Sequence, residues 1–225
     1  SYAQTDTSST GICAVSHSAF LTDRPIQHVI ANDDQLLIAM LNSLNLQRYN
    51  DALQVDNSFA NIAGYFQGMV LTADHNTLYA HDSESKKIKQ INTATGAIDA
   101  EIDVTDYPRI TTLALSPDAS QLYAITYGQA PGKLYAFDIA TGSLSSSIQL
   151  SLYLTDLIVT SDGSKIYIGE REGKLYRVDT ATFTVEHTKT LKGTLNALKL
   201  SPDESTLYLI SNDSSEQLYR VNTSN

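Results

Sequence analysis

Ten aromatic, charged and histidine side chains stand in the short segments that connect the apolar runs of this sequence. They are Tyr65, Phe66, His81, Asp82, Tyr107, Arg109, Tyr127, Tyr153, Glu170 and Arg171. Aromatic rings and arginines combine a large contact area with a polar group, and connecting segments are where binding residues concentrate. The chemistry that these residues predict is recognition of a protein or carbohydrate partner.

Catalytic chemistry has less support. The candidate carboxylates outside the repeated turns are Asp82, Asp106, Asp156 and Glu170. Two of them would act as general acid and base only if they faced one cleft in different environments. The sequence contains no G-x-S-x-G elbow, no P-loop and no dinucleotide-binding glycine motif. Its five histidines include no pair at metal-binding spacing. We therefore predict no catalytic residue, no metal ligand and no cofactor.

One phrase is repeated along the chain. It reads LTADHNTLYA, LSPDASQLYA, VTSDGSKIYI and LSPDESTLYL, with a degenerate copy, ANDDQLLIA, before them. The aligned turn residues are Asp34, Asp74, Asp118, Asp162 and Asp203, spaced 40, 44, 44 and 41 residues apart. This period is typical of four-stranded propeller blades. The sequence therefore predicts an all-β propeller of five four-stranded antiparallel blades.

Residues 110–150 show how one repeat forms a blade. Leu113 and Leu115 alternate with smaller residues, as in a strand with one buried face. The turn after them contains Pro117, which presets φ, and Asp118, whose side chain accepts backbone hydrogen bonds. Further strands read QLYAITY, KLYAFDI and SLSSSIQL. The predicted repeats lie near 28–68, 69–111, 112–156, 157–195 and 196–225.

Two regions need a separate interpretation. Residues 35–53 have a spacing of apolar residues that resembles an amphipathic helix, but the interval from Asp34 to Asp74 suits one blade and favours strands. The last repeat stops before its fourth strand. We expect the apolar segment 11–22 to complete that blade and close the ring, within one domain spanning 11–225 and preceded by a flexible segment, 1–10.

The thirteen tyrosines fall into two groups. Seven recur at two strand positions and are expected to pack between sheets: Tyr79, Tyr123, Tyr167 and Tyr208, and Tyr135, Tyr176 and Tyr219. The tyrosines outside the repeat pattern include Tyr65, Tyr107, Tyr127 and Tyr153, which are the better candidates for binding.

Composition excludes several classes of partner. The formal net charge is -10, with 25 acidic and 15 basic residues. Nucleic acids and anionic membranes require clustered positive charge, so neither is expected to bind. No stretch approaches the roughly 20 apolar residues of a membrane-spanning helix, and we expect no membrane insertion. The single cysteine, Cys13, allows no internal disulfide.

The phrases SPDASQLYA, SDGSKIYIG and SPDESTLYL, followed by LYAFDIATG and LYRVDTAT, resemble the YVTN family of β-propeller repeats. The resemblance is clearest over residues 65–225. It implies a WD40-like propeller in which the loops between strands D and A and between strands B and C surround the channel on one face, where ligands bind. It also implies an extracytoplasmic location, periplasmic, secreted or on the cell surface.

Three functions remain open from the sequence. The first is a non-catalytic binding module, monomeric if the ring closes, that presents its loop face to a protein or carbohydrate. The second is a lactonase-like or hydrolase-like propeller, or a part of a larger seven-bladed enzyme, since the same repeat occurs in such enzymes. The third is a structural spacer of a surface protein.

Overall fold

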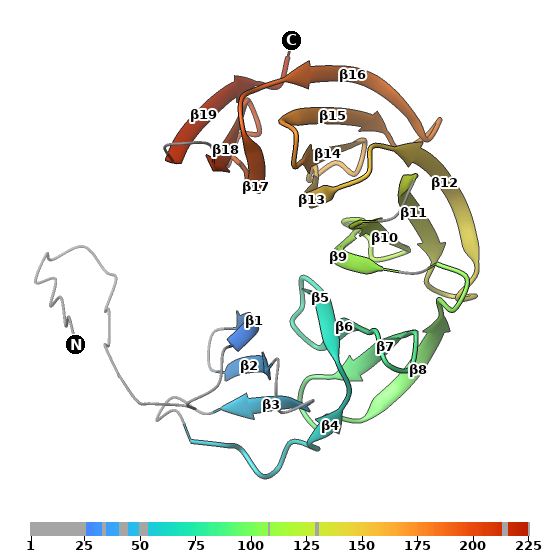
Figure 1. Cartoon of the computed structure of the whole chain (residues 1–225). Coiled ribbons are helices and arrows are strands. Elements are labelled where there is room, and N and C mark those ends of the chain that lie inside the picture. The colour runs from blue at the N-terminus through green and yellow to red at the C-terminus, as the bar shows by residue number, and fades with distance from the viewer. Residues whose placement is uncertain are drawn as a thin grey trace, which may run out of the picture.

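Nineteen strands form five antiparallel sheets in the described part of the chain, and the sheets follow one another around an arc (Figure 1). The computed structural model describes residues 26–32, 35–40, 45–49, 54–107, 109–128, 131–212 and 216–224. No helix long and apolar enough to cross a membrane occurs in those ranges. The predicted all-β propeller-like fold is confirmed.

Each sheet is one blade, and its strands are hydrogen-bonded in chain order. Blade 1 contains β1 (Ile26–Asn32), β2 (Gln35–Met40), β3 (Asn45–Tyr49) and β4 (Ile62–Ala63). Blade 2 contains β5 (Phe66–Leu71), β6 (Thr77–Asp82), β7 (Lys87–Asn92) and β8 (Ile98–Asp103). Blade 3 contains β9 (Ile110–Leu115), β10 (Gln121–Thr126), β11 (Gly132–Asp138) and β12 (Leu144–Leu150). Blade 4 contains β13 (Leu154–Val159), β14 (Lys165–Glu170), β15 (Lys174–Asp179) and β16 (Thr184–Thr190). Blade 5 contains β17 (Thr194–Leu200), β18 (Thr206–Asn212) and β19 (Glu216–Asn222).

The region with a helix-like pattern is built of strands. β2 pairs with β3 from Leu36 opposite Tyr49 to Met40 opposite Asn45. The interpretation as strands within one blade is therefore correct. Leu46 and Tyr49 on β3 are buried, so the apolar residues serve a sheet face.

The hydrophobic core lies between neighbouring blades. Tyr79 and Ile88 of blade 2 belong to one cluster with Leu122 and Phe137 of blade 3. A second cluster joins blades 3 and 4, a third joins blades 1 and 2, and a fourth joins blades 4 and 5. Each sheet therefore buries its apolar face only because another sheet stacks on it.

The repeated turns are held by their aspartates. Asp118 accepts hydrogen bonds from the Ser116 hydroxyl at 2.6 Å and from the Ser120 backbone N–H at 3.1 Å. Asp162 makes the same bonds with Thr160 at 2.6 Å and Ser164 at 2.9 Å. These bonds confirm the expected turn and explain why the aspartate recurs in every copy.

Blade 5 exposes the face that the other blades bury. Leu218 of β19 is 71% exposed, whereas Leu175 at the same position of blade 4 is 5% exposed. Tyr208 is 37% exposed and Ile210 is 49% exposed. The prediction that Tyr208 is a core residue is therefore wrong, because no described blade packs against this face.

The position of Arg220 also indicates that the exposed face of blade 5 is a blade interface. Arg177 of blade 4 donates a hydrogen bond to the Thr223 carbonyl of blade 5 at 2.8 Å. Arg48 of blade 1 donates in the same way to the Thr93 carbonyl of blade 2 at 2.6 Å. Arg220 holds the equivalent position on blade 5 and is exposed. Residues 11–22, which we expect to complete this blade, lie outside the described residues, and that expectation remains a prediction.

The turn aspartates predict a loss of stability in acid. Hydrogen bonds from Ser116 and Ser120 hold the pKa of Asp118 at about 2, and those from Thr160 and Ser164 hold the pKa of Asp162 at about 2. The folded pKa lies below the ordinary value, so the contribution is present above pH of about 4 and is lost as the pH falls toward 2. Melting temperatures between pH 7 and pH 2 test this. The Asp118→Ala variant should lose less stability on acidification than the exposed-site control Asp99→Ala, and equal losses would contradict the prediction.

The exposed face of blade 5 predicts that residues 11–22 contribute to stability. Burying one leucine contributes about 1.5–3 kcal/mol, and Leu218 is one of three exposed apolar residues on this face. Deleting residues 1–22 should lower the melting temperature and broaden the unfolding transition in calorimetry. Deleting only residues 1–10 is the matched control and should change neither. Identical transitions for the two deletions would show that the apolar segment does not stabilise the fold.

Candidate binding site on the loop face

Backbone hydrogen bonds join two kinds of loop at one end of the blades. The residue after the second strand of a blade donates to the loop that precedes its first strand: Ser83 N to Tyr65 O at 2.9 Å, Tyr127 N to Arg109 O at 3.1 Å, and Arg171 N to Tyr153 O at 3.0 Å. These loops therefore form one rim, and its donor position carries a different side chain on each of the three blades. We call this end the loop face.

Four predicted residues come together on the rim of blades 3 and 4. The rings of Tyr127 and Tyr153 lie 5.0 Å apart between centroids, tilted by 52°. The Arg171 guanidinium lies 5.2 Å from the Tyr153 ring centroid, and its Nη1 donates to the Tyr127 hydroxyl at 3.5 Å. Arg109 Nη1 donates to the Gly128 carbonyl at 3.5 Å. We call these four residues the tyrosine–arginine patch.

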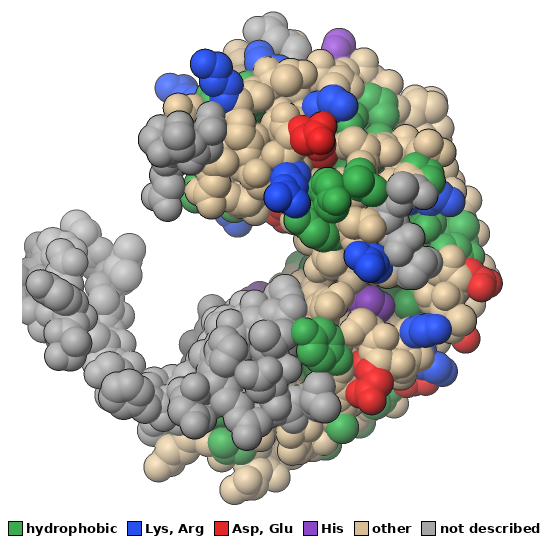
Figure 2. Space-filling view, viewed as in Figure 1, with side chains coloured by type: hydrophobic (Ala, Val, Ile, Leu, Met, Phe, Trp, Pro, Cys, Tyr) green, Lys and Arg blue, Asp and Glu red, His purple; other side chains and the backbone are tan. Residues whose placement is uncertain are grey.

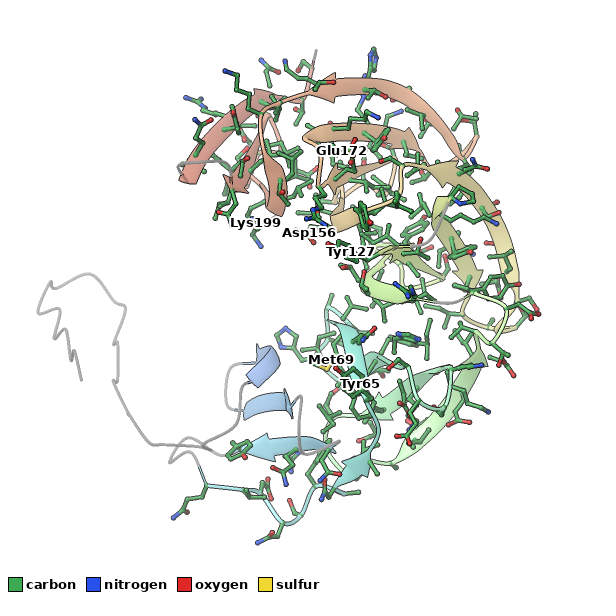
Figure 3. All side chains as sticks on the ribbon, in the orientation of Figure 1. Tyr65, Met69, Tyr127, Asp156, Glu172 and Lys199 are labelled. Carbon is green, nitrogen blue, oxygen red and sulfur yellow. The ribbon has the colours of Figure 1, made fainter. Side chains whose placement is uncertain are left out.

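The patch is accessible and partly ordered by its own contacts. Tyr127 is 36% exposed, Arg109 and Arg171 are exposed, and Tyr153 is half-buried. Figure 3 places Tyr127 at the inner edge of the arc. In Figure 2, hydrophobic and cationic side chains adjoin along this edge, near the places of β9 and β13 in Figure 1. Stacking of a guanidinium on a ring restricts both groups, which lowers the entropy lost on binding.

Four other predicted residues are buried. Phe66 is 4% exposed, His81 3%, Asp82 2% and Glu170 1%. Phe66 belongs to the core between blades 1 and 2. These residues therefore support the loop face from beneath and do not form its surface.

Asp82 is held by an ion pair and by the neighbouring loops. Its Oδ2 lies 2.8 Å from Lys89 Nζ, and its Oδ1 accepts from the Tyr65 backbone N–H at 2.9 Å. Ser85 donates to Oδ2 at 2.6 Å. Burial by itself would raise the pKa of Asp82, but the bonds from Lys89, Ser85 and Tyr65 outweigh it and hold the pKa at about 2. The carboxylate is ionised and fixes the rim of blade 2.

His81 is a neutral core residue at neutral pH. Burial lowers its pKa to about 4, against the opposing effects of a hydrogen bond to the Ile110 backbone and the charge of Asp82. Its Nδ1 is buried without a hydrogen-bond partner in the described part of the protein. His81 therefore lies between blades 2 and 3 and is not positioned to titrate near pH 7.

Glu170 also holds a turn. Its Oε1 accepts from the Glu172 backbone N–H at 2.9 Å. Asp82, Thr126 and Glu170 occupy the same position at the end of the second strand, and Thr126 accepts from the Lys133 N–H at 3.0 Å. This position is buried and polar because it fixes the following turn.

Tyr107 and Tyr65 have supporting roles. The Tyr107 ring packs edge-on against Tyr135 at 5.0 Å and against Phe137 at 5.3 Å, so it covers the core between blades 2 and 3. Tyr65 is half-buried, and its backbone anchors both Asp82 and Ser83. Tyr107, which is among the predicted binding residues, is therefore half-buried.

A charged side chain also links inner strands near the channel. Asp156 Oδ2 accepts from the Leu198 backbone N–H of blade 5 at 2.8 Å, and Oδ1 accepts from the Leu157 N–H at 2.9 Å. Burial raises the pKa of Asp156. Asp156 lies at the inner edge of the arc (Figure 3) and connects blades 4 and 5.

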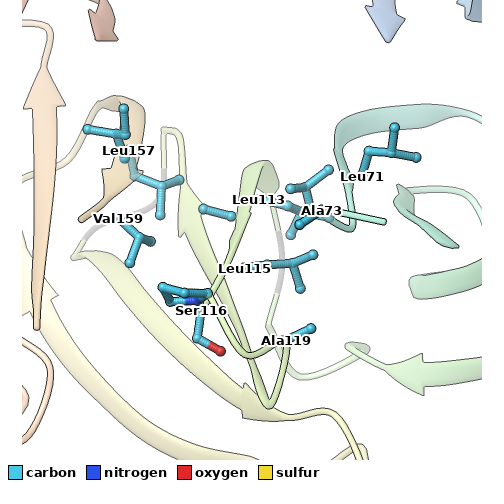
Figure 4. A pocket seen from close by; sticks show the side chains of 12 residues that line it. Leu71, Ala73, Leu113, Leu115, Ser116, Ala119, Leu157 and Val159 are labelled. Carbon is cyan, nitrogen blue, oxygen red and sulfur yellow. The ribbon is translucent and has the colours of Figure 1, made fainter. Parts of the chain in front are cut away.

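The structure shows two cavities along the inner strands. One, of about 390 Å³, is lined mainly by apolar residues of β5, β9 and β13, including Leu71, Leu113 and Leu157 (Figure 4). Ser116 also lines this cavity, and its hydroxyl donates a hydrogen bond to Asp118. The other, of about 410 Å³, lies beside Tyr127 and is lined by Gln67, next to the predicted residue Phe66, and by polar residues that the sequence analysis did not single out: Thr111, Thr112, Thr155 and Asn196. All five lie within the first three residues of an inner strand, a position that alignment of the repeats brings together.

No cluster of three or more histidine, cysteine or acidic side chains suited to a metal ion occurs among the residues described. No protein-family model matches the sequence, and no curated protein is significantly similar to it. Solved structures do match. One is a hydrazine synthase of Kuenenia stuttgartiensis, 15% identical, with a TM-score of 0.72 over 95% of this chain and 70% of that chain. At this identity the similarity shows the fold alone, and the chain therefore has a β-propeller-like fold.

Proposed function

We propose that the chain is a non-catalytic binding module that presents its loop face to a protein or carbohydrate partner. The observation that carries the proposal is the tyrosine–arginine patch, in which Arg171 stacks on Tyr153 and reaches Tyr127. Tyrosine and arginine are the residue types that dominate binding energy at interfaces. Side chains that already contact one another lose little freedom when a partner covers them.

Support also comes from the contrast between the rim and the layer beneath it. Asp82 and Glu170 accept hydrogen bonds from backbone N–H groups and are engaged in holding loops. Two of the four acidic residues that a hydrolase alternative would use are thus part of the scaffold. The exposed rim offers contact area and hydrogen bonding, which suit recognition.

The same proposal includes an extracytoplasmic location, in the periplasm, on the cell surface or outside the cell. Its support is the resemblance of the repeats to the YVTN family. Fractionation of the source cells with an antibody against the chain tests the location independently of binding.

The patch predicts a variant that loses affinity without losing stability. The partner is first identified with the intact chain on a neutral and acidic glycan array and by affinity capture from an extracellular fraction, followed by titration of the purified partner. Tyr153→Ala with Arg171→Ala should then weaken binding by about 30-fold or more, as expected for two interface hot spots. The melting temperature should change little, because Arg171 is exposed and Tyr153 is only half-buried.

The matched control is Val185→Ala with Lys189→Ala, two exposed residues of β16 on the outer edge of blade 4. It should retain full affinity. If the patch variant binds as tightly as the control, the partner does not use this part of the loop face.

A further inference from the structure

Each inner strand contains a β-bulge near its beginning. The register shifts between Ile26 and His28 in β1, between Gln67 and Met69 in β5, between Leu154 and Asp156 in β13, and between Leu195 and Ala197 in β17. In β9, Ile110 and Thr112 face consecutive residues of β10, so Thr111 is the extra residue. A bulge turns a side chain out of the regular alternation of a strand.

Alignment of the repeats on their turn aspartates places uncharged polar residues at one position in the bulged segments of blades 2 to 5: Gln67, Thr111, Thr155 and Asn196. Thr111, Thr155 and Asn196 are the extra residues of their bulges, whereas Gln67 pairs with His81 and precedes the extra residue of β5, Gly68. All four line the polar cavity of about 410 Å³, together with Thr112, Tyr127 and Leu154. This volume is in the range of small-molecule sites. Four blades therefore contribute to one cavity at the inner strands.

The cavity lining has no ionisable side chain except the tyrosine. Its amides and hydroxyls donate and accept hydrogen bonds, as the hydroxyl groups of a ligand also do. The whole chain carries a formal charge of -10, which disfavours an anionic ligand. The chemistry of the lining therefore fits a neutral ligand with several hydroxyl groups.

Two of the hydroxyls are already engaged between blades, and one is not. Thr155 Oγ1 donates to the Leu195 carbonyl, and Thr112 Oγ1 donates to the Thr155 carbonyl at 3.4 Å. Thr111 Oγ1 is buried and has no hydrogen-bond partner within the described ranges. The methyl and hydroxyl groups of threonine are similar in size, so rotation about χ1 exchanges them. Such a rotation is what the buried Thr111 hydroxyl would need to reach a ligand in the cavity, and the ligand would then satisfy it.

We propose that this cavity binds one sugar residue of a neutral glycan. Gln67, Thr111 and Asn196 hydrogen-bond its hydroxyl groups, and Tyr127 lies against the apolar face of the sugar ring. The inference rests on the proposed binding function, because Tyr127 belongs both to the cavity and to the tyrosine–arginine patch. It goes further by naming the ligand class and the residues that select it.

Saturation-transfer NMR on the intact chain tests the proposal, with a panel of neutral monosaccharides and disaccharides as probes. We expect signal from at least one sugar. Thr111→Val, which keeps the shape and removes the hydroxyl, and Asn196→Ala, at an exposed position, should each weaken its dissociation constant by about three- to tenfold. Thr188→Val on the exposed outer strand β16 is the matched control and should bind as the unchanged chain does. Thermal unfolding of each variant verifies that it folds.

The absence of signal from every neutral sugar would overturn the proposal, as would equal affinity in Thr111→Val, Asn196→Ala and the control. Signal from a neutral peptide amide that is lost in the same variants, with none from the sugars, would overturn the assignment to a glycan. These results are separable from a failure of the binding function itself. That failure would appear as unchanged partner affinity in the Tyr153→Ala, Arg171→Ala variant. Neither Tyr153 nor Arg171 lines the cavity, although both contact Tyr127, which does.

Discussion

The burial of one sheet against the next is the interaction on which this structure depends. A single blade has two faces and too few residues to bury either one alone, so its stability comes from its neighbours. The four core clusters each draw on two adjacent blades, and none lies within a single sheet. Blade 5 shows what happens without a described neighbour. Leu218 and Tyr208 are exposed because no described blade packs against them, whereas Leu175 and Tyr167 at the equivalent positions of blade 4 are buried.

Polar contacts set how neighbouring blades are aligned once the apolar faces meet. Arg48 and Arg177 each donate a hydrogen bond to a turn carbonyl of the following blade, and Asp156 accepts one from a backbone N–H of β17. Gly68, at φ 65°, allows a further close approach, because a Cβ there would lie 2.7 Å from the Thr111 carbonyl oxygen. Hydrophobic burial is not directional, whereas these bonds have fixed geometry. Such bonds therefore align the adjacent blades that they join. Between blades 3 and 4, the Gly128 N–H donates to the Leu152 carbonyl at 3.1 Å, which holds Tyr127 beside Tyr153.

The repeats predicted the fold because each copy contains the same turn aspartate and a similar alternation, and four of the five copies contain the same tyrosine. They predicted the binding site less well, because a sequence shows which loop a residue occupies but not which way its side chain faces. Phe66 begins a strand and His81, Asp82 and Glu170 lie at strand ends, next to the loops, and the structure buries all four. Arg109, Tyr127, Tyr153 and Arg171 come from equally short loops and meet at the surface. Alignment of the repeats places Gln67, Thr111, Thr155 and Asn196 at one position. The sequence does not show that these four side chains line one cavity, because that depends on how the blades are arranged.

The rim is held together by main-chain hydrogen bonds, which leaves its side chains free of a structural role in those bonds. Tyr65, Arg109 and Tyr153 hold one equivalent loop position, and Ser83, Tyr127 and Arg171 hold another, while the backbone bonds between the two positions are the same in all three blades. Those bonds use only main-chain atoms, so they place no requirement on the side chain. The buried position next to them, occupied by Asp82, Thr126 and Glu170, must instead be polar to fix the turn. Side chains at the rim can therefore change without loss of the fold, which is the freedom that the proposed binding function requires.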